Sequence, residues 1–242
     1  MVKHWFERLA DHMGEAYLKY SFTRGTQQEV DFLITALGLE PGMNLLDVGC
    51  GPGRHAHVFA GRGIKVHGID ISQTFIDIAS AGASHSATFE RVDAREMSYR
   101  SQFDAVVSLC QGAFGLSGNT QLPVPLDDPD GDILIRMAEA LVPGGKIALT
   151  AFSSYFQMRY LEDSDTFFAE HGVNHEKTLI RNMSQDEIED DLWTSCFTPR
   201  ELRLLADKAG LSLQSMWSVS PGRYKKAPLT INEPEILLIA QR

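Results

Sequence analysis

The sequence has few positive charges, few cysteines and no long apolar run. Its 22 Lys and Arg residues face 32 Asp and Glu residues, a net charge of -10. This excess of negative charge argues against a protein that binds the phosphates of nucleic acid, so we expect no nucleic-acid partner. Cys50, Cys110 and Cys196 are far apart, odd in number and without metal-ligand spacing to histidine. They fit a reducing compartment, and we expect neither disulfides nor a metal.

Membrane and export signals are also missing from the sequence. No apolar run approaches the roughly 18 residues that span a bilayer. The first 20 residues contain no apolar region typical of a signal peptide. We therefore expect a cytoplasmic protein without a membrane partner. Hydrophobic residues make up 43% of the 242 residues, and no repeat or linker interrupts them, so 1–242 is predicted to form one domain, as a monomer or a homodimer.

A glycine-rich turn dominates the first third of the chain. Residues 44–56 (NLLDVGCGPGRHA) predict a short strand, a loop with Gly49, Gly51 and Gly53, and a helix opening at Arg54. Glycines allow positive φ and leave the backbone free to approach a ligand. The helix turns its unpaired N–H groups toward the same loop. A dinucleotide-binding loop would need a further glycine where Arg54 stands.

The loop resembles motif I of the class I S-adenosylmethionine (SAM)-dependent methyltransferases, D/E-x-G-x-G-x-G, with Asp47 at the acidic position. Residues 140–149 (ALVPGGKIAL) resemble the L-x-P-G-G turn before the fifth strand of that family. The resemblance covers about residue 25 to the end. It implies an α/β, Rossmann-like, seven-stranded, mostly parallel sheet with helices on both faces and an antiparallel last strand. It also implies N-terminal helices in 1–38 that form a lid, and a substrate-covering insert at 153–196.

Acidic residues after two later strands suggest how SAM is held. Asp70 follows the strand 65–69 about 20 residues past the loop, where a carboxylate reaches a ribose. A helix cap is the alternative, but Ser72 is the better N-cap. Arg24, in the loop between two helices, suits the α-carboxylate of SAM, although a solvated role is also open. The resemblance places Asp93 on the adenine amino group with the Ala94 backbone beside the ring. It adds further cofactor positions at Cys50, Ile71 and Leu109.

The acceptor site is less clearly marked. Residues 110–115 (CQGAFG) lack the Asn/Asp-Pro-Pro-aromatic motif of enzymes that methylate DNA amino groups, which counts against a DNA substrate. The insert 153–196 is too long for a plain loop, although a solvated insertion is the alternative. His175 is the favoured general base, because an imidazole titrates near physiological pH. His171 and Glu176 are the other candidate bases, with the caution that neighbours on a strand face opposite sides. We expect acceptor contacts from Tyr17, Tyr20, Gln111, Phe114, Tyr155, Arg159 and Tyr224.

These features predict methyl transfer from SAM to an O or N nucleophile of a small-molecule acceptor. Two other classes share part of the pattern. An NAD(P)-dependent oxidoreductase would also start with this strand–turn–helix unit, but Arg54 and Asp47 argue against it. A non-catalytic SAM-binding protein would share the whole cofactor pattern and lack only turnover.

Overall fold

A computed structural model describes residues 4–116 and 128–242 of the chain. Within these ranges no helix is both long and apolar enough to cross a membrane. The sequence of 116–131 is rich in Gly, Pro and Asp, which predicts a loop, and most of this stretch lies outside the described residues.

The elements follow the predicted alternation of strands and helices. The helices are α1 (Trp5–Met13), η1 (Gly14–Lys19), η2 (Ser21–Thr23), α2 (Thr26–Leu37), α3 (Arg54–Gly61), α4 (Gln73–Ala81), α5 (Pro129–Ala140), α6 (Ser154–Arg159) and α7 (Pro199–Lys208). The strands are β1 (Asn44–Val48), β2 (Lys65–Asp70), β3 (Ala87–Arg91), β4 (Phe103–Ser108), β5 (Leu141–Ser153), β6 (Thr166–Phe168), β7 (Val173–Arg181), β8 (Glu187–Phe197), β9 (Ser212–Val219) and β10 (Glu235–Gln241).

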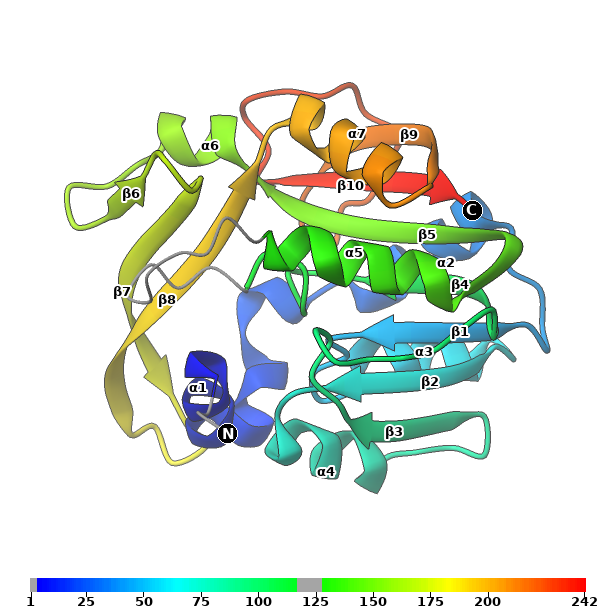
Figure 1. Cartoon of the computed structure of the whole chain (residues 1–242). Coiled ribbons are helices and arrows are strands. Elements are labelled where there is room, and N and C mark those ends of the chain that lie inside the picture. Colours follow the sequence, from blue (N-terminus) through cyan, green and yellow to red (C-terminus); the bar gives the residue numbers. More distant parts are fainter. Residues whose placement is uncertain (1–3, 117–127) are drawn as a thin grey trace.

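The central sheet runs β3-β2-β1-β4-β5, with β10 and then β9 beyond β5. All neighbours from β3 to β5 are parallel, whereas β10 is antiparallel to both β5 and β9. Helices α5 and α7 cover one face over a large apolar cluster, and α2 and α3 cover the other (Figure 1). Because β1 and β4 are neighbours, the carboxyl ends of β1, β2 and β4 meet where ligands bind in such sheets. The predicted fold class is confirmed.

The insert after β5 enlarges this sheet, so the strand count of seven was too low. The last two residues of β8 pair with the last two residues of β5, Cys196 with Phe152 and Phe197 with Ser153. Strands β7 and β8 then form a long antiparallel hairpin, with β6 at its edge. The hairpin leans away from the central sheet (Figure 1). The described residues thus form a ten-stranded sheet that branches at β5, which pairs with β4, β8 and β10.

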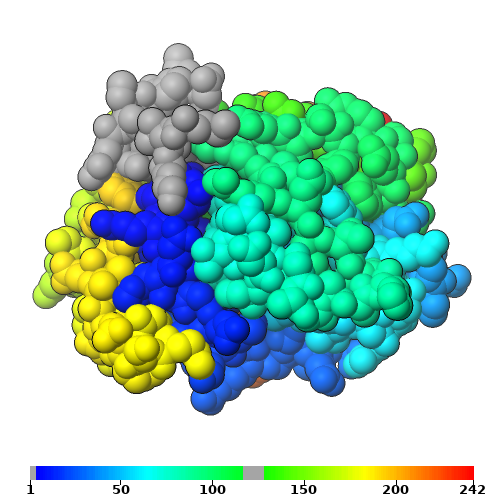
Figure 2. All heavy atoms as spheres, turned by 90° about the horizontal axis from the view of Figure 1, so that it is seen from below, coloured from blue at the N-terminus to red at the C-terminus, as the bar shows by residue number. Residues whose placement is uncertain are grey.

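The N-terminal segment fills the space between the hairpin and the central sheet. Figure 2 shows it (blue) between the β7–β8 region (yellow) and the first half of the sheet (cyan to green). Leu9, Ala10 and Met13 of α1 pack on Phe75 of α4 and Ile180 of β7 in a small cluster of their own. An ion pair between Arg8 and Asp190 adds a polar tie from α1 to β8. This segment, residues 5–23 from α1 to η2, is called the N-terminal cover below. It contacts both the hairpin and the central domain at α4.

Behind the cover, the turn before α2 touches the connection from β9 to β10. Gly25 has φ +92° and lies so close to Gly222 that an added Cβ would be 2.3 Å from the Gly222 Cα. The Glu29 carboxylate of α2 accepts the Gly222 N–H at 2.6 Å. Two segments almost 200 residues apart in sequence are therefore joined backbone to backbone.

This contact predicts different effects for two alanine substitutions with the same backbone conformation. Gly42 has φ +93° and no atom within 4 Å of an added Cβ. Gly42→Ala should therefore cost only the left-handed conformation, about 1–2 kcal/mol. Gly25→Ala should cost a further 1–3 kcal/mol or so from overpacking. Denaturant unfolding of both variants measures the difference, and equal losses would show that the close contact contributes nothing.

Candidate active site

Two adjoining cavities lie at the carboxyl edge of the central sheet. The smaller one has about 420 Å³ of empty space, partly open to solvent, next to the ends of β2 and β3. The larger one has about 1290 Å³ of empty space, partly open to solvent, between the N-terminal cover, the hairpin and the strand ends. Both are lined by Phe6, Gly49, Asp70, Gly112 and Leu116. A ligand with two ends can therefore occupy both cavities through one junction.

The glycine loop takes the conformation expected for a ligand cradle. Gly49, Gly51 and Gly53 all have positive φ, from +55° to +81°. A Cβ at Gly51 would meet nothing closer than 3.9 Å, so this glycine faces open space. Gly49 instead presses on Gly112, where a Cβ would lie only 2.1 Å from the backbone. The loops after β1 and β4 therefore touch directly and close the floor of the junction.

Asp70 is fixed by the loop that it faces. Its carboxylate accepts the Gly51 N–H and the Ser72 N–H, each at 2.8 Å. Ser72 is the N-cap of α4, since its hydroxyl accepts the Phe75 N–H. A carboxylate offers about four acceptor sites, so two remain for a ligand in the cavity. Burial raises the pKa of Asp70 to about 6. Its position fits the predicted ribose contact.

Asp47 lies buried beneath the loop with unmet bonding capacity. It is 2% exposed, and its Oδ2 has no hydrogen-bond partner among the described residues. Burial raises the pKa of its carboxyl to about 7 against the opposing charge of Arg54. A buried acceptor without a partner is costly. This orphaned oxygen fits a ligand that brings a cationic donor to the loop, as the amino group of SAM does.

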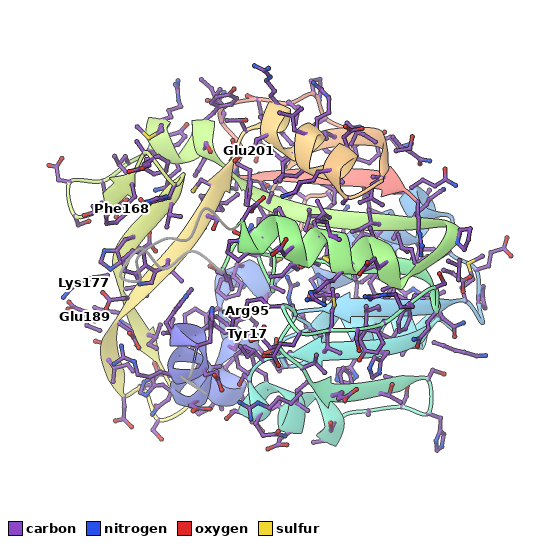
Figure 3. The ribbon with its side chains drawn as sticks, viewed as in Figure 1. Tyr17, Arg95, Phe168, Lys177, Glu189 and Glu201 are labelled. Atoms are coloured by element: carbon purple, nitrogen blue, oxygen red, sulfur yellow. The ribbon has the colours of Figure 1, made fainter. Side chains whose placement is uncertain are left out.

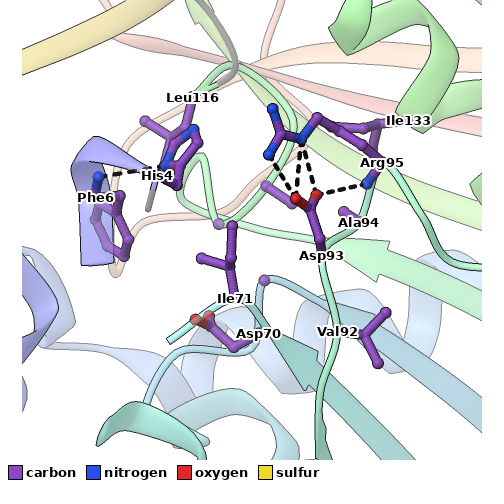
Figure 4. A pocket seen from close by; sticks show the side chains of 13 residues that line it. His4, Phe6, Asp70, Ile71, Val92, Asp93, Ala94, Arg95, Leu116 and Ile133 are labelled. Atoms are coloured by element: carbon purple, nitrogen blue, oxygen red, sulfur yellow. Dashed lines mark hydrogen bonds and ion pairs between the residues drawn. The ribbon is translucent and has the colours of Figure 1, made fainter. Parts of the chain in front are cut away.

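The smaller cavity has a lining of apolar and charged side chains (Figure 4). Ile71, Val92 and Ala94 supply apolar surface, and Asp93 supplies a carboxylate. Arg95 holds that carboxylate through its backbone N–H and its guanidinium. Asp93 is therefore oriented by Arg95, and both of its oxygens already accept hydrogen bonds from that residue. The predicted adenine residues share one cavity.

Other predicted cofactor positions support the loop from behind. Cys50 is buried and donates its N–H to the Ile69 carbonyl, and Gly53 is the N-cap of α3. The Leu109 carbonyl accepts the Gly112 N–H. Arg24 is exposed and lines neither cavity, which does not fit a carboxylate contact.

Arg54 is the buried arginine of this region. Its guanidinium donates to Glu29 Oε2 at 2.9 Å and to Cys110 Sγ at 2.8 Å. His55 also bonds Glu29, at 2.7 Å, and burial lowers its pKa to about 4. From the sequence, Arg54 was only the position where a dinucleotide-binding loop would need a glycine, and these contacts were not predicted.

The larger cavity brings some predicted acceptor residues together and adds unpredicted ones. Tyr17, Tyr20 and Gln111 line it, as expected. Glu176, one of the candidate bases, also lines it. Unpredicted lining residues are Phe6, Met13, Phe22, Phe75, Cys110, Phe152, Gln157, Asn174, Thr178, Thr194 and Glu235. Most of these residues belong to the N-terminal cover or to the β7–β8 hairpin, two segments that are far apart in sequence. Glu235 had one signal, a charge at the first position of an otherwise apolar strand.

His175 lies on the wrong side of the hairpin for a general base. It stacks on Trp193 at 4.1 Å between ring centroids and bonds Asp191 through Nε2 at 2.8 Å. Figure 3 shows Lys177, two residues on, at the outer side of the hairpin with Glu189. Because side chains alternate along a strand, Glu176 faces the cavity and His175 does not. The favoured base is therefore not supported by its position.

Three other predicted residues also lie outside the cavities. His171 is exposed, and Tyr155 of α6 is 49% exposed. Arg159 places its guanidinium over the ring of Tyr160 at the end of α6.

Two aromatic residues predicted to touch the acceptor are buried in apolar cores. Phe114 is fully buried and stacks on Phe197, at 4.6 Å between centroids. Tyr224 is buried against Phe32. Both were assigned from aromatic character, which packing explains equally well. Within residues 4–116 and 128–242 no group of three acidic, His or Cys side chains is placed to hold a metal.

This fold and this loop define a class of protein. Residues 45–145 match the family described as "Methyltransferase domain". Over this stretch the chain resembles the class I SAM-dependent methyltransferases, and its fold is that of solved methyltransferases, one of them bound to SAM.

The curated relatives match this chain over only part of their own length. Over 141 residues it is 33% identical to the ribosomal RNA small subunit methyltransferase C of Chromohalobacter salexigens, covering 58% of this chain and 40% of that protein. Over 192 residues it is 26% identical to the ubiquinone biosynthesis O-methyltransferase of Alkalilimnicola ehrlichii, covering 77% and 68%. The first alignment thus spans well under half of the relative.

Solved structures match along nearly the whole chain. The CcbJ methyltransferase of Streptomyces caelestis superposes with a TM-score of 0.76 at 16% identity, covering 96% of both chains. SAM-bound CalS10 of Micromonospora echinaspora, an amino pentose methyltransferase, gives 0.65 at 21% identity, covering 94% and 95%. At these identities the likeness concerns the fold, including the insert and the N-terminal cover.

The two free acceptor positions of Asp70 predict a large loss of SAM affinity on substitution. Asp70→Asn keeps the shape but removes the charge, and a hydrogen bond to a charged group is worth about 1.5–3 kcal/mol. Calorimetric titration with SAM should show about tenfold or weaker binding. Asp77→Asn on the exposed side of α4 is the matched control and should bind normally. Unchanged affinity in a folded Asp70→Asn protein would remove Asp70 from the cofactor site.

The raised pKa of Asp47 predicts a pH-dependent stability gain for Asp47→Asn. The folded carboxyl titrates near 7, whereas an unfolded Asp titrates near 4. Between these values the folded state binds more protons, so the carboxyl destabilises the fold increasingly as pH rises. Without SAM, the variant should match the wild type near pH 4 and exceed it at pH 8, by no more than about 4 kcal/mol. A pH-independent difference in unfolding free energy would contradict the assignment.

Proposed function

We propose that this chain transfers the methyl group of SAM to a nitrogen or oxygen nucleophile of a small-molecule acceptor bound in the larger cavity. One observation carries the proposal: the cavity joins the glycine loop and is closed on two other sides by the N-terminal cover and the hairpin. Such an enclosed, mostly apolar pocket with a few polar groups suits a small molecule. Residues 1–242 would act as one domain, in the cytoplasm.

The chain's own residues account for what this reaction requires. Asp47, Asp70 and Asp93 would hold SAM, which supplies an electrophilic methyl group on a sulfonium. The aromatic lining from the cover excludes water and suits a cationic centre, with Tyr17 against Phe75 at 5.0 Å between centroids. Polar groups of the hairpin and the strand ends orient the acceptor. Alignment and exclusion of water are the main contributions of the protein to such a transfer.

A ribosomal RNA acceptor is the second candidate, because one relative carries that name. The net charge of -10 disfavours it, and so does the cavity, whose lining within the described residues contains no Lys, Arg or His. Two other similar proteins reported above are named as an O-methyltransferase of ubiquinone biosynthesis and as an amino pentose methyltransferase. These names support a small molecule and leave both nitrogen and oxygen open.

A bulky side chain in the larger cavity should impair methylation of the acceptor without changing SAM affinity. Thr194 lines the larger cavity from β8, whereas Glu189 lies on the outer face of the hairpin. We expect Thr194→Trp to lose at least about tenfold in methyl transfer while SAM affinity stays unchanged, because the indole fills acceptor space. Glu189→Trp should keep both. The assay follows labelled methyl from SAM into fractions of a metabolite extract and into ribosomal RNA.

The same assay tests the class of acceptor. Label in the small-molecule fraction that disappears with Thr194→Trp supports the proposal. Label that enters only RNA would overturn it, and so would SAM binding without transfer to either fraction.

A further inference from the structure

Glu235 is a buried carboxylate at the far end of the larger cavity. It is the first residue of β10, paired with Phe152 of β5 and Val219 of β9, and it is 4% exposed. Because β10 is antiparallel, its start lies at the carboxyl edge of the sheet. The order β1-β4-β5-β10 puts it three strand spacings, about 14 Å, from the strand that carries the glycine loop. Glu235 therefore faces the acceptor part of the cavity.

One oxygen of this carboxylate has a partner and the other has none. Oε1 accepts a hydrogen bond from Gln111 Nε2 at 3.2 Å. Oε2 is buried without a hydrogen-bond partner among the described residues. Buried polar groups in native proteins are nearly always paired, and an exception calls for a reason. A donor from a ligand in the cavity supplies the missing bond.

The backbone that presents Gln111 is held in an unfavourable conformation. Cys110 and Gln111 both have φ near +52°, in the left-handed region. This conformation costs a non-glycine residue about 1–2 kcal/mol. The Cys110 N–H donates to Thr150 Oγ1 at 2.7 Å, which pins the turn to β5. Such outliers persist where the surrounding structure enforces them, and they cluster at functional sites.

The charges around Glu235 favour a cation. The lining of the larger cavity carries the carboxyl groups of Asp70, Glu176 and Glu235, and no basic side chain of the described residues. Arg54, behind the cavity wall, is paired with Glu29. Tyr17, Tyr20, Phe22 and Phe152 add aromatic faces that attract cations. Burial raises the pKa of Glu235 to about 7, so its carboxyl can release and take up a proton near neutral pH.

We propose that Glu235, oriented by Gln111, binds the protonated amine of the acceptor and accepts its proton, which makes nitrogen the nucleophile. This inference rests on the proposed function and narrows it to amine acceptors. The acceptor ammonium gives one proton to the carboxylate and keeps the N–H bonding pair as a lone pair. That pair forms the nitrogen–methyl bond, while the carbon–sulfur pair stays on sulfur as a neutral thioether. The product leaves as a methylated ammonium, and Glu235 returns its proton to solvent.

Matched probes test the ammonium site without turnover. Benzylamine and benzyl alcohol have the same size and differ in charge, and their binding to the whole chain is measured by ligand-observed NMR. We expect the amine to bind at least about tenfold more tightly to the wild type. Glu235→Gln should abolish this preference, and the outer-face control Glu189→Gln should retain it. Equal binding, no binding of either probe at millimolar concentration, or a preference that survives Glu235→Gln overturns the proposal.

Further measurements distinguish this proposal from an ammonium site at Glu176, from a cofactor role of Glu235 and from transfer to oxygen. Loss of the preference in Glu176→Gln but not in Glu235→Gln would assign the ammonium to the hairpin and overturn the role of Glu235. Weakened SAM binding in Glu235→Gln would place Glu235 in the cofactor site and also overturn it. Transfer of labelled methyl only to oxygen acceptors refutes the amine inference and leaves the proposed function intact. Absence of transfer to any small molecule refutes the proposed function itself.

Discussion

Burial of carboxyl groups along one edge of the sheet is the constraint on which the site depends. Asp47 under the glycine loop, Asp70 at the end of β2 and Glu235 at the start of β10 are each less than 5% exposed. Burial raises the pKa of all three to between about 6 and 7. A cationic ligand that reaches this edge recovers interaction energy that the empty protein lacks, and its binding stabilises the fold by mass action. Ligand recognition and fold stability are therefore coupled through the same groups.

The apolar cores make this arrangement tolerable. A large cluster under α5 and α7 and a second one under α2 and α3 pack both faces of the central sheet. Backbone donors bond both oxygens of Asp70, whereas Asp47 and Glu235 each keep one oxygen without a partner among the described residues. Glu235 lines the larger cavity, whereas Asp47 lies beneath the glycine loop and is not among the residues that line either cavity. This division follows from strand order, because β4 and β5 separate β1 from β10.

The cofactor half was predictable from the sequence, and the acceptor half was not. A strand–turn–helix unit is local, so the glycine spacing and the distance to Asp70 define that geometry within about 25 residues. The acceptor wall depends on which face of the β7–β8 hairpin turns inward, and one position in register exchanges the two faces. His175 and Glu176 are neighbours in sequence and lie on opposite sides. Glu235 and Gln111 meet across 124 positions, a contact that no local pattern contains.

The N-terminal cover adds a reason why the acceptor can reach so enclosed a cavity. Its apolar cluster is small, with five buried residues from α1, α4 and β7, and it is separate from the two clusters under the sheet. Segments held by few buried contacts open at a lower free energy than the core does. The ion pair of Arg8 with Asp190 has one exposed partner, and such pairs contribute at most about 1 kcal/mol. The cover can therefore separate from the hairpin without disturbing the glycine loop, which is fixed by backbone contacts of its own. The cover also reaches the smaller cavity, because Phe6 lines both cavities, so its separation from the hairpin would open the two cavities together.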